Sequence, residues 1–88
     1  MKITIKYSGL LSEMLGVYLE ELEIPSSVNL KELVEILASR HPQLRVVLEN
    51  IPVIQFYLNN REVLPGSSNI VLKDHDEITI SLPMFEGG

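Results

Sequence analysis

Two segments far apart in the chain alternate strictly between polar and apolar residues, one near each end of the sequence. Residues 2–7 (KITIKY) and 77–82 (EITISL) both place an apolar side chain at every second position. A period of two residues is typical of a β-strand that buries one face and exposes the other. We therefore predict a half-buried sheet built from both ends of the chain, with the intervening residues covering one of its faces.

The clearest signal between these strands is a helix over residues 29–40. Asn29 is a favoured N-cap residue, and Glu32 three positions later completes a capping-box pattern. Apolar residues then follow at helical spacing on one side: Leu30, Leu33, Val34 and Leu37. His41-Pro42 ends the helix, because the residue before a proline is pushed out of the α region.

The remaining elements are assigned from alternation and turn signals. We expect a connection with one short helical turn at 8–16, a strand at 17–24 whose first half has room for a bulge, and further helix at 43–50. A strand is expected at residues 53–58, a short returning strand at 61–63 and a brief extended stretch at 70–72, with turns at Asn59-Asn60 and at 73–76.

The predicted order of elements is strand, strand, helix, strand, short strand, strand. One main helix covers only one face of a sheet, so five residues of the end strands should face solvent: Lys2, Thr4, Lys6, Thr79 and Ser81. A helical crossover after a hairpin favours a mixed sheet with the first and last strands as central neighbours. The predicted fold class is α+β, with a sheet of four to five strands in residues 1–82 and a flexible tail at 83–88.

Composition narrows the class of function. The 88 residues suit one domain, and their net charge of −5 opposes nucleic-acid binding but suits a partner protein with a basic docking surface. The absence of cysteine excludes disulfides, thiolate metal sites and a thiol nucleophile. No apolar run reaches the ~18 residues that cross a bilayer, and the start of the chain lacks the pattern of a signal peptide. We expect a cytoplasmic protein without nucleic-acid or membrane partners.

The stretch from Pro83 to Gly88 is the predicted working part of the protein. Glycine has no Cβ, so Gly87-Gly88 can enter a channel too narrow for other residues. If the chain ends there, its last group is a bare carboxylate. Six extended residues reach at most ~20 Å, which lets the tail enter a buried site while the domain stays outside. A frayed terminus or an expression scar is the alternative explanation of this ending.

These stretches together resemble the β-grasp sulfur carriers, most of all the small subunit of molybdopterin synthase (the MoaD-like group of the MoaD/ThiS superfamily). The matching stretches are residues 58–63 (LNNREV), residues 72–78 (LKDHDEI), Pro83 and Gly87-Gly88. The family's turn usually has glycine where this chain has His75, and histidine tolerates the left-handed region better than most residues. The resemblance covers essentially the whole chain and implies a ubiquitin-like β-grasp fold.

The resemblance also implies chemistry at Gly88. An E1-like adenylating enzyme would use ATP and Mg²⁺ to adenylate the terminal carboxylate, and a sulfur donor would displace AMP to leave a thiocarboxylate. The sulfur would then pass to a substrate held by the larger synthase subunit or by another sulfur-accepting enzyme. The chain would bind no cofactor or metal and would not be catalytic alone, but would form the small subunit of a molybdopterin synthase-type sulfurtransferase.

Three further tail residues are candidates for contact with a partner. Gly87 would provide clearance, Pro83 would stiffen the exit of the tail, and Phe85 would either anchor an interface or fold back onto the domain's own sheet. Alternative functions are a carrier for thiamine synthesis or tRNA thiolation, a ubiquitin-like modifier attached to lysines, and a plain binding module. The acidic residues of the turn at 74–77 are interpreted as a solvated loop, and the two histidines, His41 and His75, as structural.

Overall fold

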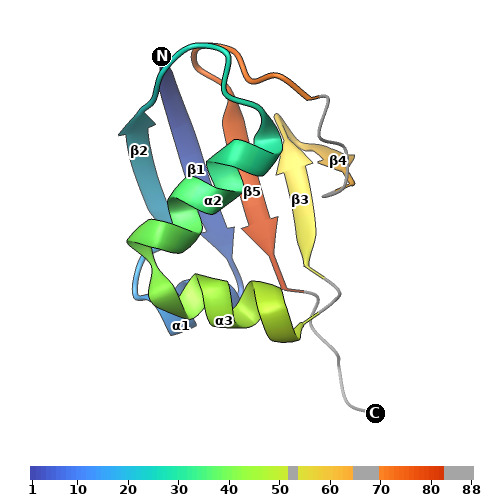
Figure 1. The fold of residues 1–88 in the computed structure, drawn as a ribbon. Coiled ribbons are helices and arrows are strands. Elements are labelled where there is room, and N and C mark those ends of the chain that lie inside the picture. Colours follow the sequence, from blue (N-terminus) through green and yellow to red (C-terminus); the bar gives the residue numbers. More distant parts are fainter. Residues whose placement is uncertain (52–53, 65–69, 83–88) are drawn as a thin grey trace.

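The computed structural model describes residues 1–51, 54–64 and 70–82, and it is organised around a five-stranded sheet (Figure 1). The strands are β1 (Lys2–Ser8), β2 (Leu19–Glu23), β3 (Gln55–Leu58), β4 (Arg61–Val63) and β5 (Glu77–Ser81). The helices are α1 (Leu10–Leu15), α2 (Leu30–Arg40) and α3 (Pro42–Asn50). The strand order is β2-β1-β5-β3-β4, in which only the β1–β5 pair is parallel.

The first and last strands are central neighbours, as the helical crossover after a hairpin predicted. Ile5 lies opposite Ile78 and Tyr7 lies opposite Ile80 in the β1–β5 pair. Ile5, Ile78 and Ile80 have no exposed surface, so this pair forms the floor of the hydrophobic core. Complete burial of such side chains stabilises the fold by about 1.5–3 kcal/mol each.

Helix α2 begins and packs as its sequence indicated. The Asn29 side chain accepts a hydrogen bond from the Glu32 backbone N–H at 2.8 Å, and the Glu32 carboxylate accepts one from the Asn29 N–H at 3.2 Å. Leu30, Leu33 and Leu37 turn inward and are fully buried against the sheet. The capping box therefore fixes where the helix starts, and the apolar stripe fixes which side faces the core.

The other helices and the edge strand are more regular than expected. Residues 42–50 form a complete helix, α3, and the expected helical turn near Leu10 is the six-residue α1. The strand expected at residues 17–24 begins only at Leu19, and its register against β1 runs without interruption from there to Glu23. The extended stretch expected at residues 70–72 makes one isolated bridge, between Val71 and Asn29.

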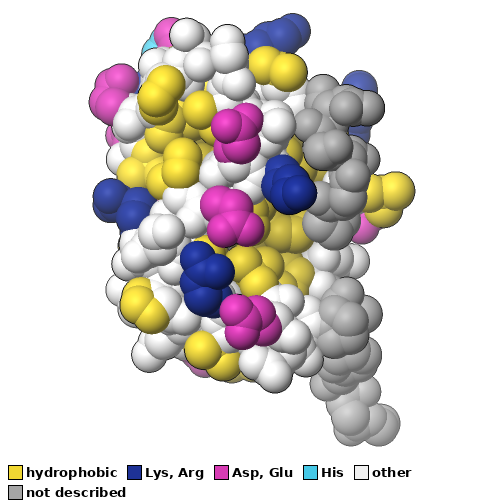
Figure 2. Space-filling model, viewed as in Figure 1, with side chains coloured by type: hydrophobic (Ala, Val, Ile, Leu, Met, Phe, Trp, Pro, Cys, Tyr) yellow, Lys and Arg dark blue, Asp and Glu magenta, His cyan; other side chains and the backbone are white. Residues whose placement is uncertain are grey.

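The face of the sheet opposite the helices is open, as predicted. Its five expected residues are exposed or half-buried: Lys2, Thr4, Lys6, Thr79 and Ser81. Its ion pairs join neighbouring strands, Lys2 with Glu21 at 3.7 Å and Lys6 with Glu77 at 3.2 Å. On the helical side, charged side chains of both signs alternate with apolar ones (Figure 2). None of the helices in the described part of the chain has the length and hydropathy needed to cross a bilayer.

Candidate functional site

The root of the predicted tail lies at the middle of the sheet. Leu82 directly follows β5 and is only 6 % exposed, so residue 83 is joined to a fixed, buried position. Just before it, Ser81 lies between Ser8 of β1 and Gln55 of β3. This end of the sheet is called the tail end below. The residues predicted to act, Gly88, Gly87, Pro83 and Phe85, lie outside the described residues, as does the whole predicted tail, and their roles remain predictions.

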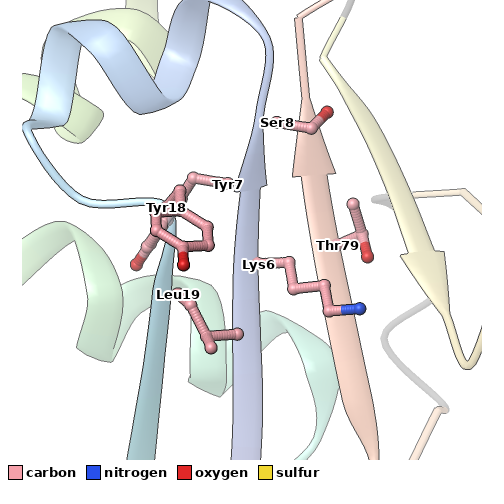
Figure 3. Close-up of a pocket in the computed structure, with 6 residues that line it drawn as sticks. All are labelled: Lys6, Tyr7, Ser8, Tyr18, Leu19 and Thr79. Atoms are coloured by element: carbon pink, nitrogen blue, oxygen red, sulfur yellow. The ribbon is translucent and has the colours of Figure 1, made fainter.

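A hollow of about 340 Å³ opens on the open face of the sheet near the tail root. This open-face hollow is lined by residues of β1, β2 and β5 and by the residue before β2: Lys6, Tyr7, Ser8, Tyr18, Leu19 and Thr79. Figure 3 shows Tyr18 and Leu19 on the β2 side and the Lys6 side chain extending toward β5, below Thr79. Tyr18 is 72 % exposed and Leu19 is 44 % exposed, so the hollow offers apolar area to a partner.

The helical side has a second hollow at the same end of the molecule. It measures about 360 Å³ and lies between Met14 of α1 and Gln43 and Val46 of α3. Leu10, one turn before Met14, is also half exposed. Large exposed apolar side chains therefore occur on both sides of the sheet at the tail end.

A partly buried polar cluster lies between β1, β2 and the α2–α3 junction. The Glu20 carboxylate accepts a hydrogen bond from the Tyr7 hydroxyl at 3.2 Å and lies 3.0 Å from Nε2 of His41. The Tyr7 and His41 rings meet edge to face with centroids 5.6 Å apart, and Nε of Arg40 lies 3.8 Å from Glu20. Burial, together with the nearby Glu20 carboxylate, raises the pKa of Tyr7 far above its usual value.

The opposite end of the sheet, called the turn end below, is held by carboxylates that bind backbone N–H groups. Asp76 accepts from the Lys73 N–H at 2.7 Å and from the Asn59 side chain at 2.9 Å, while Asp74 accepts from the Lys2 N–H at 2.7 Å. That last hydrogen bond lowers the pKa of Asp74. Because these carboxylates accept from the chain itself, the turn is structural, and the described residues contain no group of three or more potential metal ligands.

The sequence patterns predicted the strands that carry these features. They did not predict the Tyr7–Glu20–His41 cluster or the exposure of Tyr18. Tyr7, Glu20 and His41 are far apart in sequence, so only the hairpin and the α2–α3 junction bring them together. The exposure of Tyr18 was hidden because the alternation of β2 is irregular at its start. The signal that could have indicated this exposed site is a large aromatic residue, Tyr18, beside an unclear strand boundary.

The topology and the packing of helix α2 across the sheet place the molecule in the ubiquitin-like β-grasp class. The model of the ThiS family matches residues 5–88, which is nearly the whole chain. The chain therefore belongs to the ThiS family of β-grasp sulfur carriers.

Solved structures agree with this fold. SAMP1 from Haloferax volcanii superposes with a TM-score of 0.82 at 18% identity, covering 100% of both chains. A putative molybdopterin converting factor subunit 1 from Pyrococcus furiosus gives 0.77 at 24% identity, covering 96% of this chain and 99% of that one. A complex of subunits 1 and 2 of molybdopterin-converting factor from Helicobacter pylori gives 0.67 at 23% identity, covering 99% and 100%. At these identities the likeness establishes the fold, and no curated sequence matches the chain.

Proposed function

We propose that this protein carries sulfur for molybdopterin synthesis on the C-terminal carboxylate of Gly88. The observation that carries the proposal is the position of Leu82, which is buried at the end of the central strand. A segment joined there starts from a rigid point, so a partner that binds the domain also fixes where the segment begins. The short distance from Thr79 in the open-face hollow to Leu82, about 10 Å along the strand, puts domain contacts next to that starting point.

The proposed reaction has three steps. A carboxylate oxygen of Gly88 attacks the α-phosphate of ATP in an E1-like partner, which breaks the α–β anhydride bond and releases pyrophosphate. A hydrosulfide equivalent then attacks the acyl carbon, and AMP leaves with the carboxylate oxygen. The thiocarboxylate sulfur then attacks an electrophilic carbon of an acceptor in a larger synthase subunit and displaces a leaving group there. Water cleaves the remaining acyl–sulfur bond, which leaves the sulfur on the acceptor and restores the carboxylate. ATP and Mg²⁺ belong to the adenylating partner, which also neutralises the phosphate charge.

The surface around the tail root suits a protein that partner enzymes act on. The Glu20 carboxylate, which is only partly buried, is engaged within the chain by Tyr7 and His41. The exposed apolar side chains beside the tail root are suited to contact with another protein. The solved subunit 1–subunit 2 complex from Helicobacter pylori supports a larger subunit as one such partner.

The proposal is tested by mass spectrometry of the intact chain. Protein isolated from its own cells first establishes whether the chain ends at Gly88. The purified chain is then incubated with its adenylating enzyme, ATP, Mg²⁺ and sulfide, and we expect one oxygen to be replaced by one sulfur. A chain lacking Gly87-Gly88 and a chain with one alanine added after Gly88 are the controls. No exchange in the native chain, while a known carrier is converted in a parallel reaction, would refute the proposal.

The pathway is a separate question from the terminal chemistry. The thiocarboxylate form should convert a molybdopterin precursor when mixed with the cognate large subunit. Conversion of a thiamine precursor or thiolation of tRNA instead would retain the carrier chemistry and reject the molybdopterin assignment.

A second candidate function is attachment to the lysines of other proteins. The specific observation is the full-length superposition on SAMP1, because a solved relative from Methanosarcina acetivorans bears the name small archaeal modifier protein 1. In this case proteolysed cell extracts would contain lysines bearing a Gly-Gly remnant from this chain. Their absence in extracts that contain the thiocarboxylate form would leave the carrier function alone.

A further inference from the structure

β2 and β4 are the terminal strands of the sheet, and the outer edge of β2 is the longer of the two. β2 is a terminal strand of five residues, whereas β4 at the other edge has three. Across the described ranges, β1 is the only named element that packs beside β2 (Figure 1). An uncovered strand edge presents a row of backbone donors and acceptors to any extended segment that approaches.

The hydrogen-bond pattern shows which groups point outward. Tyr7 donates its N–H to the Tyr18 carbonyl at 2.9 Å, and Ile24 donates its N–H to the Met1 carbonyl at 2.9 Å. Pairs in an antiparallel ladder alternate between bonded and non-bonded, and the register between these two pairs is continuous. The backbone groups of Leu19, Glu21 and Glu23 therefore face away from β1.

The side chains of the same three residues lie on the open face of the sheet. Leu19 lines the open-face hollow at one end of the edge. Glu21 and Glu23 follow at alternate positions and are exposed, and Glu21 makes a surface ion pair with Lys2 at 3.7 Å. An exposed pair of this length contributes little, so the Glu21 carboxylate is available to a new cation. The edge thus combines free backbone groups, an apolar end and two carboxylates.

We propose that the outer edge of β2 binds an extended basic segment of a partner protein by strand addition. Backbone hydrogen bonds form with Leu19, Glu21 and Glu23, while side chains of the segment pack on the open face. Antiparallel pairing is the more stable arrangement. It places basic residues opposite Glu23 and Glu21 and an apolar residue over the hollow, so the segment has the pattern basic–any–basic–any–apolar.

The charge of the edge selects this occupant over a second copy of the chain. Two β2 edges brought together would oppose carboxylates to carboxylates, which is destabilising across a strand pair. A basic segment has the opposite charge and is also attracted by the net charge of −5. Strand addition is an established mode of peptide recognition in which backbone bonds give affinity and side chains give specificity.

Strand addition at β2 goes beyond the proposed sulfur chemistry. It uses no atom of the predicted tail and needs neither ATP nor a thiocarboxylate. Its test can therefore fail while sulfur transfer succeeds, and the reverse is equally measurable.

The probe is a capped heptapeptide with lysine at its second and fourth positions, leucine at its sixth and threonine or valine elsewhere. It is titrated into the full-length, isotope-labelled chain and followed by NMR. We expect shifts centred on β2 and roughly tenfold slower hydrogen exchange of the Leu19, Glu21 and Glu23 amides in the complex. A peptide N-methylated at the bonding positions keeps its charge but should bind roughly tenfold more weakly, because it lacks the donors.

Matched variants of the chain separate the edge from general charge attraction. The double variant Glu21→Lys, Glu23→Lys should lose at least about tenfold in affinity for the peptide. The double variant Glu49→Lys, Glu62→Lys, in α3 and in the opposite edge strand β4, makes the same change in net charge and should bind like the native chain. Chemical denaturation confirms that all variants fold. Strand addition would be overturned if the N-methylated peptide bound as tightly as the unmodified one, or if the chemical shift changes lay away from β2. It would also be overturned if no shifts changed at a peptide concentration that saturates a positive control.

Discussion

The two ends of the central β1–β5 pair are built from different kinds of residue. At the turn end, Asp74 and Asp76 accept backbone hydrogen bonds, and Asn59 accepts one from the Glu77 N–H at 2.9 Å. At the tail end, Tyr18 and Leu19 expose large apolar side chains on the open face. The carboxylates of the turn end are engaged by the chain itself, whereas the apolar surface of the tail end is available to another molecule.

This difference separates residues that hold the fold from residues that meet a partner. Both ends lie beside the same two strands. They differ in residue type and in whether their side chains bind the chain itself or are exposed to another molecule. The predictions below test that separation, from the largest expected effect to the smallest.

Asp76→Ala should be the most destabilising surface change. It removes the acceptor for the Lys73 N–H and for the Asn59 side chain, and we expect a loss of about 2 kcal/mol in the free energy of unfolding. Chemical denaturation measures this loss. Below the unfolding transition, the variant should still accept sulfur at the native rate, and a large fall in that rate would mean that the turn end also meets the partner.

Tyr18→Ala should have the opposite effects, with little change in stability and a large fall in the rate of adenylation. The side chain is 72 % exposed, so its removal should change the free energy of unfolding by less than about 0.5 kcal/mol. If it anchors a partner, kcat/KM for adenylation should fall roughly tenfold, equivalent to about 1.4 kcal/mol. Val71→Ala, which alters an exposed apolar residue away from the tail end, is the control and should leave the rate unchanged.

Tyr7→Phe tests the polar cluster at the tail end. It should lower the free energy of unfolding by about 1 kcal/mol at neutral pH. Because the folded state raises the pKa of Tyr7, the unfolded chain ionises first, near 10.0. The stabilisation is therefore complete below that pH and is lost as the pH rises through the folded-state pKa. Denaturation curves should show native stability falling above about pH 10 relative to the variant. A constant difference across that range would contradict the assignment.

His75→Gly should produce the smallest change, and it should be stabilising. His75 has a φ of 69°, a left-handed conformation that glycine adopts without steric cost. We expect a gain of about 0.5 kcal/mol, measured by chemical denaturation. Asn60→Gly is a useful comparison, because asparagine is already tolerant of the φ of 68° found there. A loss of stability at position 75 would show that its imidazole contributes more than its backbone costs.

The elements that could be predicted are those specified by short-range signals. The capping box at Asn29 and Glu32 fixed the start of α2, and strict alternation identified β1 and β5. Two consecutive asparagines marked the β3–β4 turn, where Asn59 and Asn60 both have positive φ. Each signal acts within a few residues, so no knowledge of the fold was required.

What could not be predicted depends on residues that meet only in three dimensions. The first residues of β2 lack clean polar–apolar alternation, because the apolar side chain of Leu19 lines the open-face hollow instead of the core. The Tyr7–Glu20–His41 cluster needs the β1–β2 register and the α2–α3 junction at once. The predicted roles of Gly87 and Gly88 belong to chemistry performed by another protein, so their test is biochemical.

The parallel pairing of β1 with β5 also sets the order in which the protein can form. Thr4 pairs with Glu77, although nearly the whole chain separates them. During synthesis the first strand is made early, yet its central neighbour is made after all the other helices and strands of the described residues. Contacts between such distant residues slow folding, and the unpaired edge of β1 stays exposed in the meantime. We therefore expect the nascent chain to remain unfolded until β5 is available and then to fold in one cooperative step.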